Sequence, residues 1–444
     1  MKRTVRMIAL ALLVTCVLAL MTVPAGAKKD VIKLWTYPVH KQYDQELPVL
    51  LEKFNALNPN IEVQYEILAW AEGPQKFEVA LNAGDPPDVY WCKPDPKYVK
   101  TGLMVPLDAY ISKEEREDYS EIGLSGFTIE GKLHGVPLYV FIYTLGGNRE
   151  LLEEAGVDWR KIQRQGWTWD EFLATCHKLT KKLPDGRTQY GFVMPGYNSE
   201  LWEMLMLNNN CPQIVLPDGK LGWTQDKTLE ALKFIRRLMD EGVMPKEVSG
   251  MGAIKRWELF NSWDTAMFGR GIPYFEVMSL QRRKDIEDGK ITGRPIDYVS
   301  LPFPYKPGAP PRTFGGVEGY SLFRQKKYQG DAHTANAAKL LKFLTGPEAG
   351  GGAVELAYLP VSKKGQELFK AKIAKLNPDN VAFTERQLSL IYWPTPIPLD
   401  LGAKESRIKS EVILPVFQAV LAYEMTPQEA AEAFIQRATR ILQR

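Results

Sequence analysis

The stretch VIKLW at residues 31–35 and two later ones, IEVQYEI at residues 61–67 and DVYW at residues 88–91, predict three β-strands. The first and third are short and mostly apolar, as strands buried on both faces are. The second alternates apolar and polar side chains, which is the period of a half-buried strand. These three strands are the starting point for the fold.

Helices are predicted between these strands and beyond them. Apolar residues recur at helical spacing over residues 47–57, and again over residues 77–81, where Gly84 fits as the C-terminal cap. The alternation of strand and helix indicates a parallel α/β layer. Thr-x-x-Glu signatures at residues 168–171 and 426–429 are capping boxes that predict two later helix starts.

The first 27 residues predict export. The basic residues Lys2, Arg3 and Arg6 precede an uncharged apolar run over residues 7–21. The small residues Ala25 and Ala27 lie just before Lys28. The run is shorter than the about 20 apolar residues of a membrane-spanning helix. We therefore expect a signal peptide over residues 1–27, cleaved after Ala27, which places the protein in the periplasm or on the extracellular face of the cytoplasmic membrane. Lipidation at Cys16 is a weaker alternative.

Charge and length limit the class of protein. Residues 1–27 hold three of the 56 basic residues and no acidic one, so the rest of the chain carries 53 basic and 53 acidic residues. This balance argues against a nucleic-acid partner or an anionic membrane surface. The mature chain is too long for one hydrophobic core, which predicts two or more domains in what we expect to be a monomer.

No catalytic residue, metal site or cofactor is predicted. The sequence contains neither a phosphate-binding GxxxxGK[ST] loop nor a GxSxG elbow. The four histidines are far apart, and no Cys/His cluster has the spacing of a zinc site. Carboxylates are plentiful, and their arrangement in space cannot be read from the sequence, so a glycosidase is unsupported by motif rather than excluded.

Five segments, in chain order, resemble the extracellular solute-binding protein family 1, the mostly sugar-binding receptors of ABC importers. They lie at residues 81–91; 131–137 with 147–157 and 166–172; 266–274; 301–304 with 315–319; and 343–348 with 358–362 and 427–430. LNAGDPPDVYW at residues 81–91 is similar to the family's Ala-x-Gly-x-x-Pro-Asp-Val passage. Two departures stand out, because Gly147 and Pro273 occupy positions where the family usually has tyrosine and tryptophan.

The resemblance implies a two-lobed α/β fold of the type II periplasmic-binding-protein kind, with a mixed β-sheet flanked by helices in each lobe. The chain would cross between the lobes, so that residues 28–141 and 300–360 form the N-terminal lobe. Residues 142–299 and 361–444 would form the C-terminal lobe. The ligand would lie in the cleft between them.

Candidate ligand-binding residues follow from the predicted strand ends, because open α/β sheets bind ligands beyond the carboxyl ends of their strands. A sugar site needs aromatic plates together with side chains that hydrogen-bond hydroxyl groups. The candidates are Tyr37, Trp70, Trp91, Lys93, Asp95, Tyr197, Asn198, Trp263, Asp264, Tyr274, Glu318, Tyr392 and Trp393.

The leading hypothesis is a receptor that captures a sugar or oligosaccharide and delivers it to the permease subunits of an ABC transporter. A second hypothesis keeps the fold and changes the ligand to a non-sugar solute. A third, from another class, is a secreted carbohydrate-active enzyme, which would share the aromatic residues and the export signal.

Overall fold

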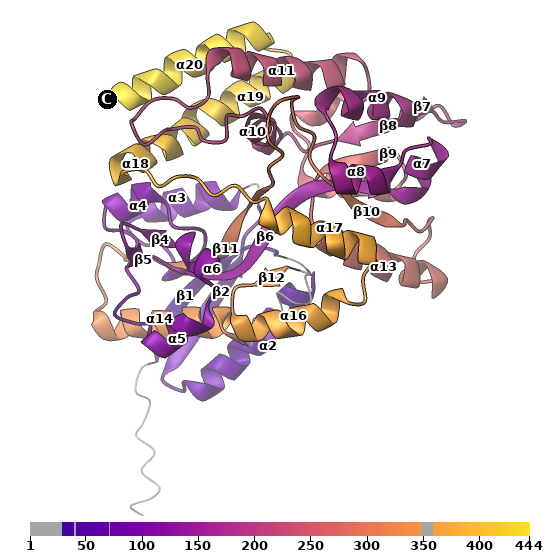
Figure 1. Cartoon of the computed structure of the whole chain (residues 1–444). Helices are drawn as coiled ribbons and strands as arrows, with labels where there is room; N and C mark the ends of the chain where they lie inside the picture. Colours follow the sequence, from indigo (N-terminus) through magenta and orange to yellow (C-terminus); the bar gives the residue numbers. More distant parts are fainter. Residues whose placement is uncertain (1–28, 40, 71, 348–357) are drawn as a thin grey trace, which may run out of the picture.

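The computed structural model describes residues 29–39, 41–70, 72–347 and 358–444 (Figure 1). The expected signal peptide and Cys16 lie outside these residues. Within the described ranges, no helix has both the length and the apolar character needed to cross a bilayer.

The three predicted strands form as expected. β1 (Asp30–Thr36) pairs in parallel with both β2 (Ile61–Ile67) and β3 (Val89–Trp91). The connections are α2 (Lys41–Leu57) and α3 (Gly73–Ala83). Helix α3 ends at Gly84, whose φ of +81° is the left-handed conformation that glycine adopts easily. The predicted parallel α/β layer is confirmed.

One sheet continues from this layer across the molecule, in the order β2-β1-β3-β11-β6-β9-β8-β7. The added strands are β6 (Val136–Asn148), β7 (Lys181–Lys182), β8 (Thr188–Val193), β9 (Thr265–Gly271) and β11 (Phe314–Leu322). β11 is antiparallel to both of its neighbours, β3 and β6, whereas β8 and β9 are parallel. The sheet is therefore mixed.

Strand β6 joins the two halves of the protein (Figure 1). Its residues 136–143 pair with β11, and residues 144–148 pair with β9 and with β10 (Tyr298–Leu301). A side chain at Gly146 would meet the ring of Phe268 at 2.4 Å, so the crossing needs glycine there. The same strand thus belongs to the backbone hydrogen-bond ladders of both halves.

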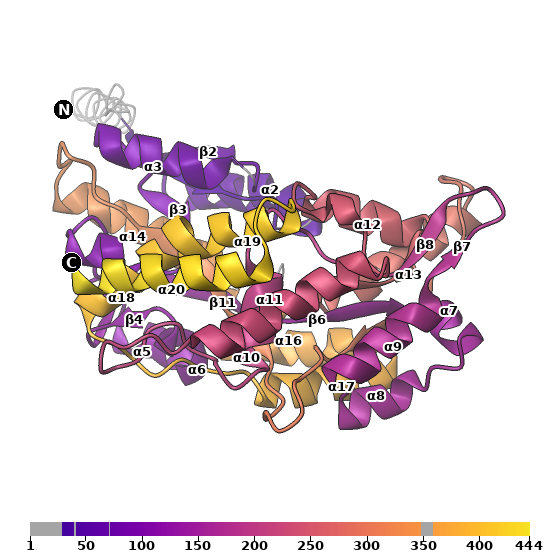
Figure 2. The ribbon, with the colours of Figure 1, turned by 90° about the horizontal axis from the view of Figure 1, so that it is seen from above.

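The helices cover this sheet, and both predicted capping boxes form, at Thr168 and at Thr426. Figure 2 shows α11 (Gln225–Asp240) and α20 (Pro427–Gln443) lying side by side over the second half. The remaining helices are α4 (Pro96–Lys100), α5 (Lys113–Asp118), α6 (Glu121–Ser125), α7 (Arg149–Glu154), α8 (Trp159–Gln165), α9 (Trp169–Leu179), α10 (Glu200–Leu207), α12 (Ala253–Asn261), α13 (Tyr274–Glu287), α14 (Asp331–Thr345), α16 (Lys363–Ile373), α17 (Pro378–Ser389), α18 (Leu399–Ile408) and α19 (Leu414–Leu421), with a π-helical turn at Lys409–Ile413 and a 3₁₀ turn at Lys246–Val248. Three two-residue strands, β4 (Thr128–Ile129), β5 (Lys132–Leu133) and β12 (Leu359–Pro360), complete the elements.

Buried apolar side chains form two separate cores. One gathers residues between 32 and 141 and between 317 and 361, and the other gathers residues between 145 and 303 and between 408 and 441. A chain of this length divides into lobes because one core cannot grow indefinitely. Side chains such as Tyr143 and Phe314 pack against both cores, so they lie where the lobes meet. The lobe boundaries given above remain a prediction.

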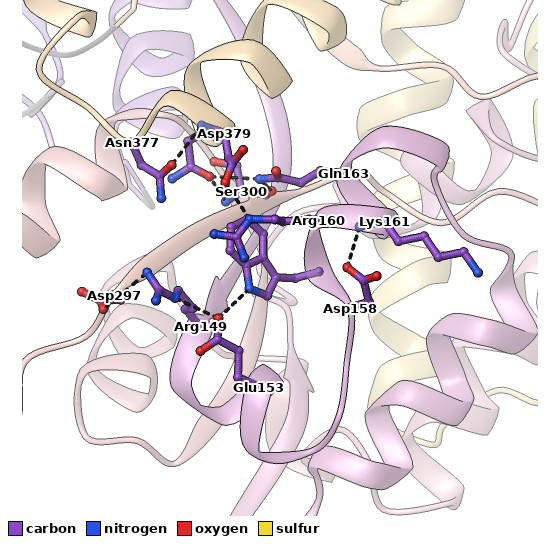
Figure 3. Close-up of polar contacts among 12 residues, drawn as sticks. Arg149, Glu153, Asp158, Arg160, Lys161, Gln163, Asp297, Ser300, Asn377 and Asp379 are labelled. Atoms are coloured by element: carbon purple, nitrogen blue, oxygen red, sulfur yellow. Dashed lines mark hydrogen bonds and ion pairs between the residues drawn. The ribbon is translucent and has the colours of Figure 1, made fainter.

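Helix α17 is fastened to the second lobe by polar contacts (Figure 3). Arg160 of α8 donates to Asp379 at 2.9 Å. Asn380 accepts from Gln163 at 3.1 Å and from the backbone of Ser300 at 3.0 Å. These bonds hold α17 against α8 and β10, whereas the preceding helix, α16, packs beside β12 of the first lobe. Residues 363–389 therefore provide another crossing between the lobes.

A buried histidine ties the first strands to α14. His333 is 6% exposed and lies between two carboxylates, with Nε2 2.8 Å from Asp88 and Nδ1 2.7 Å from Asp30. The hydrogen bond to Asp88 is the largest cause that raises the pKa of His333, to about 9, and Asp30 adds to it against the opposing effect of burial. The protonated imidazole thus bridges β1 and the turn before β3.

This bridge predicts a pH-dependent stability. The pKa of His333 rises from 6.5 to about 9 on folding, so its stabilisation is complete below pH 6.5 and is lost as the pH rises through 9. The difference corresponds to about 3 kcal/mol. Urea unfolding should show the parent protein losing this stability between those pH values, while His333→Gln starts lower and changes little. His177→Gln, at an exposed histidine, is the control and should follow the parent. Parallel curves for the parent and His333→Gln would contradict the assignment.

Candidate functional site

Two cavities lie between the lobes. The Glu318 cavity, of about 170 Å³, is lined by Val39, Trp70, Tyr139, Phe141, Tyr143, Tyr197, Ala253, Arg256, Arg270, Ile272, Phe275, Glu318 and Tyr358. The Trp393 cavity, of about 260 Å³, is lined by Lys93, Gly126, Glu203, Leu207, Pro212, Gln213, Ile214, Trp223, residues 314–317, Tyr392, Trp393, Pro394, Glu405 and Lys409. Both sets draw on the two lobes and on the strands that connect them.

The Glu318 cavity lies beyond the carboxyl ends of parallel strands. Trp70 follows β2, Tyr197 follows β8, and Arg270 is close to the end of β9. This is the edge at which open α/β sheets bind ligands. β6 and β11 contribute side chains that share one face, because Tyr139 is opposite Glu318 in the antiparallel register.

Trp70 offers an exposed aromatic plate. Its ring stacks on Tyr37 with centroids 4.3 Å apart, and its indole Nε1 donates to the carbonyl of Pro38 at 3.1 Å. Tyr37 beneath it is buried, whereas Trp70 is 43% exposed. The ring is therefore held in place on one side and open to solvent on the other, as stacking on an apolar sugar face requires.

Arg270 organises the opposite wall of the Glu318 cavity. Its Nε lies 3.0 Å from Glu200, its Nη2 donates to the Tyr143 hydroxyl at 3.0 Å, and its Nη1 donates to the Tyr197 hydroxyl. Each hydroxyl that accepts from Arg270 keeps its own proton for another acceptor. Arg270 has a φ of +58°, a conformation that is strained for a residue with a long side chain.

Arg256 holds this strained backbone in place through hydrogen bonds. The side chain is 3% exposed, and its Nη1 donates to the carbonyls of Gly269 at 2.9 Å and of Arg270 at 3.0 Å. Burial, with the positive charge of Arg270 nearby, lowers the pKa of Arg256 to about 10. It therefore stays charged at neutral pH and fixes the position of Arg270.

Glu318 brings a carboxyl group to the cavity beside these cations, and Glu200 pairs with Arg270. Burial raises the pKa of Glu318, and the positive charges of Lys93 and Arg270 oppose that rise. Burial also raises the pKa of Glu200, against Arg270. The guanidinium of Arg270 keeps its charge at the pH values of folded proteins, and at 3.0 Å it favours the ionised form of the Glu200 carboxyl. The carboxyl of Glu318 can accept hydrogen bonds from hydroxyl groups of a ligand.

The Trp393 cavity combines an aromatic plate with several polar groups. Trp393 is 36% exposed, and the Tyr392 hydroxyl beside it donates to Gln213 at 3.3 Å. Glu405 and Lys409 form an ion pair at 3.4 Å along the same wall. Hydroxyl-rich ligands need this mixture of acceptors and donors.

Six of the thirteen predicted site residues line the two cavities. Trp70, Tyr197 and Glu318 line the Glu318 cavity, and Lys93, Tyr392 and Trp393 line the Trp393 cavity. Whether they contact a ligand remains a prediction.

The other predicted residues lie elsewhere. Trp91 is 2% exposed and packs against Tyr320 in the first core, and Tyr37 supports Trp70 from beneath. Asp95 caps α4 by accepting from the backbone of Lys97 at 2.8 Å. Asn198 accepts from the backbone of Glu200 at 3.3 Å.

Trp263 and Asp264 precede β9, so they lie at the edge of the sheet opposite the cleft, where Trp263 lines a separate cavity. Asp264 contacts Arg187 there. Tyr274 opens α13, and its side chain lies outside the described part of the structure.

Sequence reasoning missed the residues on β6 and the two arginines. In the sequence, the segment that contains Tyr139, Phe141 and Tyr143 has the composition of an apolar strand. Only the crossing of this strand between the lobes places their rings at a cavity. Arg270 lay within the segment at residues 266–274 that carried the family resemblance, which was the available signal. Arg256 is on α12, and no motif or strand end in the sequence marked it as a site residue. Among the described residues no cluster of His, Cys, Asp or Glu could hold a metal ion.

The family model for bacterial extracellular solute-binding proteins matches residues 37–351. The chain belongs to this family. A binding protein of Brucella abortus (strain 2308) is 25% identical over 298 residues, and the match spans 66% of this chain and 66% of that relative. The resemblance seen in the sequence is therefore confirmed for this solute-binding protein.

Solved structures show the same fold. The maltose/maltodextrin-binding domain MalE from Bdellovibrio bacteriovorus, bound to maltotriose, has a TM-score of 0.73 at 20% identity and covers 93% of this chain and 100% of its own. The substrate-binding protein Lmo0181 from Listeria monocytogenes, in complex with cycloalternan, has a TM-score of 0.71 at 19% identity and covers 93% and 99%. The predicted two-lobed, type II periplasmic-binding-protein fold is confirmed.

The Glu200–Arg270 pair predicts a stability effect. Glu200→Gln leaves the guanidinium of Arg270 without its carboxylate, and the two side chains are only 17% and 21% exposed. We expect a loss of about 2–3 kcal/mol in unfolding free energy, below the roughly 3–5 kcal/mol of a fully buried pair. Urea denaturation at neutral pH measures it.

The matched control is Glu203→Gln, one turn further along α10, where the carboxylate accepts from Ser199 at 2.7 Å and makes no ion pair with a described residue. Equal losses for the two variants would show that Arg270 does not depend on Glu200.

Proposed function

We propose that this solute-binding protein captures a saccharide in the cleft between its lobes and delivers it to the permease of an ABC transporter. The observation that supports this most is the lining of the Glu318 cavity. The exposed ring of Trp70 faces a set of hydroxyls and charged groups held by Arg270. Aromatic plates with hydrogen-bonding groups match the apolar faces and hydroxyl rims of sugars.

Hinge closure would link binding to transport. β6 is continuous through both lobes, so the lobes can rotate about it while their cores stay intact. A ligand that contacts both walls of the cleft favours the closed form by its differential affinity. The closed form would then present both lobes together to the membrane subunits.

Other ligands are less well matched. The two arginines of the Glu318 cavity already bind Glu200, two tyrosine hydroxyls and backbone carbonyls. They are therefore committed to partners rather than free to clamp a phosphate. The family comprises binding proteins, and we propose that this chain likewise returns its saccharide unchanged rather than cleaving it.

A saccharide screen tests the proposed function. A cognate sugar should raise the melting temperature, since a ligand at a hundred times its Kd adds about 2.7 kcal/mol of stability. Glu318→Gln should weaken this shift because a carboxylate acceptor is lost. Tyr65→Ala, at an exposed aromatic on β2 outside both cavities, should leave it unchanged. A broad panel of mono- and oligosaccharides that gives no shift at millimolar concentration would overturn the sugar assignment, and saccharide recovered as cleaved product would indicate an enzyme.

We further propose that residues 1–27 are removed on export. Mass spectrometry of the protein purified from cells that secrete it should give a mature N-terminus at Lys28. A diacylglycerol-modified N-terminus at Cys16 would instead show a lipoprotein tethered beside its permease.

A further inference from the structure

A smaller cavity lies outside the cleft, where α8 and α17 meet the segment at residues 302–313 that leads from β10 to β11. It has a volume of about 90 Å³ and shares no lining residue with the Glu318 cavity or the Trp393 cavity. Gln163, one of the residues that hold α17 in Figure 3, lines it. The cavity therefore belongs to a different part of the molecule from the proposed saccharide site.

The lining of this cavity is rich in positive charge. Three arginines line it, Arg164 of α8, Arg312 before β11 and Arg386 of α17, and no aspartate or glutamate does. Within the part of the chain that the structure describes, none of these three forms an ion pair, whereas the neighbouring Arg160 binds Asp379 at 2.9 Å. The protein thus gathers three guanidinium groups here without a carboxylate to neutralise them.

Arg312 also has a buried donor that lacks an acceptor. Its guanidinium carbon lies 5.1 Å from the centroid of the Tyr392 ring, and its backbone amide donates to Asn208 at 3.0 Å. Its Nη1 is buried and has no hydrogen-bond partner among the described residues. An unmet N–H of a charged group is costly when it is withdrawn from water. An anion in the cavity would supply the acceptor.

The helices that meet here offset only part of the charge. Arg164 and Arg386 are in the last turns of α8 and α17. The C-terminus of a helix carries about half a negative charge, so the two helices together compensate about one of the three guanidinium charges. A charge of about +2 remains. Inorganic phosphate and sulfate carry about two negative charges at neutral pH and would balance it.

The size of the cavity also indicates a small ion. Its volume of about 90 Å³ is several times the roughly 10–15 Å³ that one water needs, and well below the about 300 Å³ at which pockets for organic ligands begin. The wall at Gly166 is closely packed, because a Cβ there would lie 2.9 Å from the Tyr305 ring. The planar fork of an arginine matches the oxygens of a tetrahedral oxyanion.

We propose that this cavity binds free inorganic phosphate or sulfate through Arg164, Arg312 and Arg386. The bound ion would fasten three segments together: α8, residues 302–313, and α17, which belongs to a crossing between the lobes. Thr313 already donates to Gln387 of α17 at 2.6 Å, so the ion would reinforce an existing contact. A free ion is favoured over a lipid headgroup because the mature chain carries as many acidic as basic residues.

Titration calorimetry of phosphate and of sulfate into the mature protein, at constant ionic strength, tests this proposal. The parent should bind either ion at a single site. Arg312→Gln and Arg386→Gln should each weaken binding by at least about tenfold, because each removes a charge-assisted hydrogen bond. Arg437→Gln is the matched control, since this arginine is exposed on α20 and forms no ion pair with a described residue. It should bind like the parent.

Melting temperatures separate an anion site from a structural role of the arginines. Without phosphate, Arg312→Gln and Arg386→Gln should melt at or above the temperature of the parent, because one of three like charges has been removed. Phosphate should raise the melting temperature of the parent and of Arg437→Gln but not of these two variants. Circular dichroism shows whether each variant is folded, and Arg386, which is exposed, can be changed without disturbing a core.

Three results would overturn the proposal. The first is that millimolar phosphate and sulfate give neither heat nor a rise in melting temperature. The second is an equal rise with chloride at the same ionic strength, which would show general screening. The third is equal phosphate binding by the parent, Arg312→Gln and Arg386→Gln. Vesicles of phosphatidylglycerol form a separate arm, in which sedimentation with the vesicles, lost in Arg312→Gln and without binding of free phosphate, would assign the cavity to a headgroup and overturn the free-ion site.

Discussion

The pairing of one strand with two sets of partners is the constraint on which this structure depends. β6 forms ladders with β11 in the first lobe and with β9 and β10 in the second, and the change occurs between Tyr143 and Thr144. Register along a strand is strongly specified, because a shift by one residue would turn every side chain to the other face. The rings of Tyr139, Phe141 and Tyr143 therefore reach the cleft together.

Both walls of the cleft are held in place by contacts within the protein. Trp70 is stacked and hydrogen-bonded, and the wall around Arg270 is fixed by an ion pair, two hydroxyls and a strained backbone held by Arg256. Strained residues persist only where their surroundings fix them, and they gather at functional sites. Arg270 thus prepares hydrogen-bonding geometry before a ligand arrives, which reduces the entropy lost on binding.

Local signals predicted much of the fold and only part of the site. The strands at residues 31–35 and 61–67 and the caps at Thr168 and Thr426 depend on neighbouring residues, and all were predicted. Site placement depends on tertiary structure. Trp91 follows the strand period into the core, and Trp263 precedes its strand rather than following it. Arg256 acts through contacts with a segment that no local pattern connects to it.

A saccharide receptor of this fold should hold an uncleaved saccharide between its lobes. A crystal structure of the mature protein with the tightest-binding saccharide of the screen tests this most directly. We expect intact saccharide density stacked on Trp70, within hydrogen-bonding distance of Glu318 and of the Tyr143 and Tyr197 hydroxyls. Density outside both cavities, or a cleaved saccharide in the cleft, would contradict it.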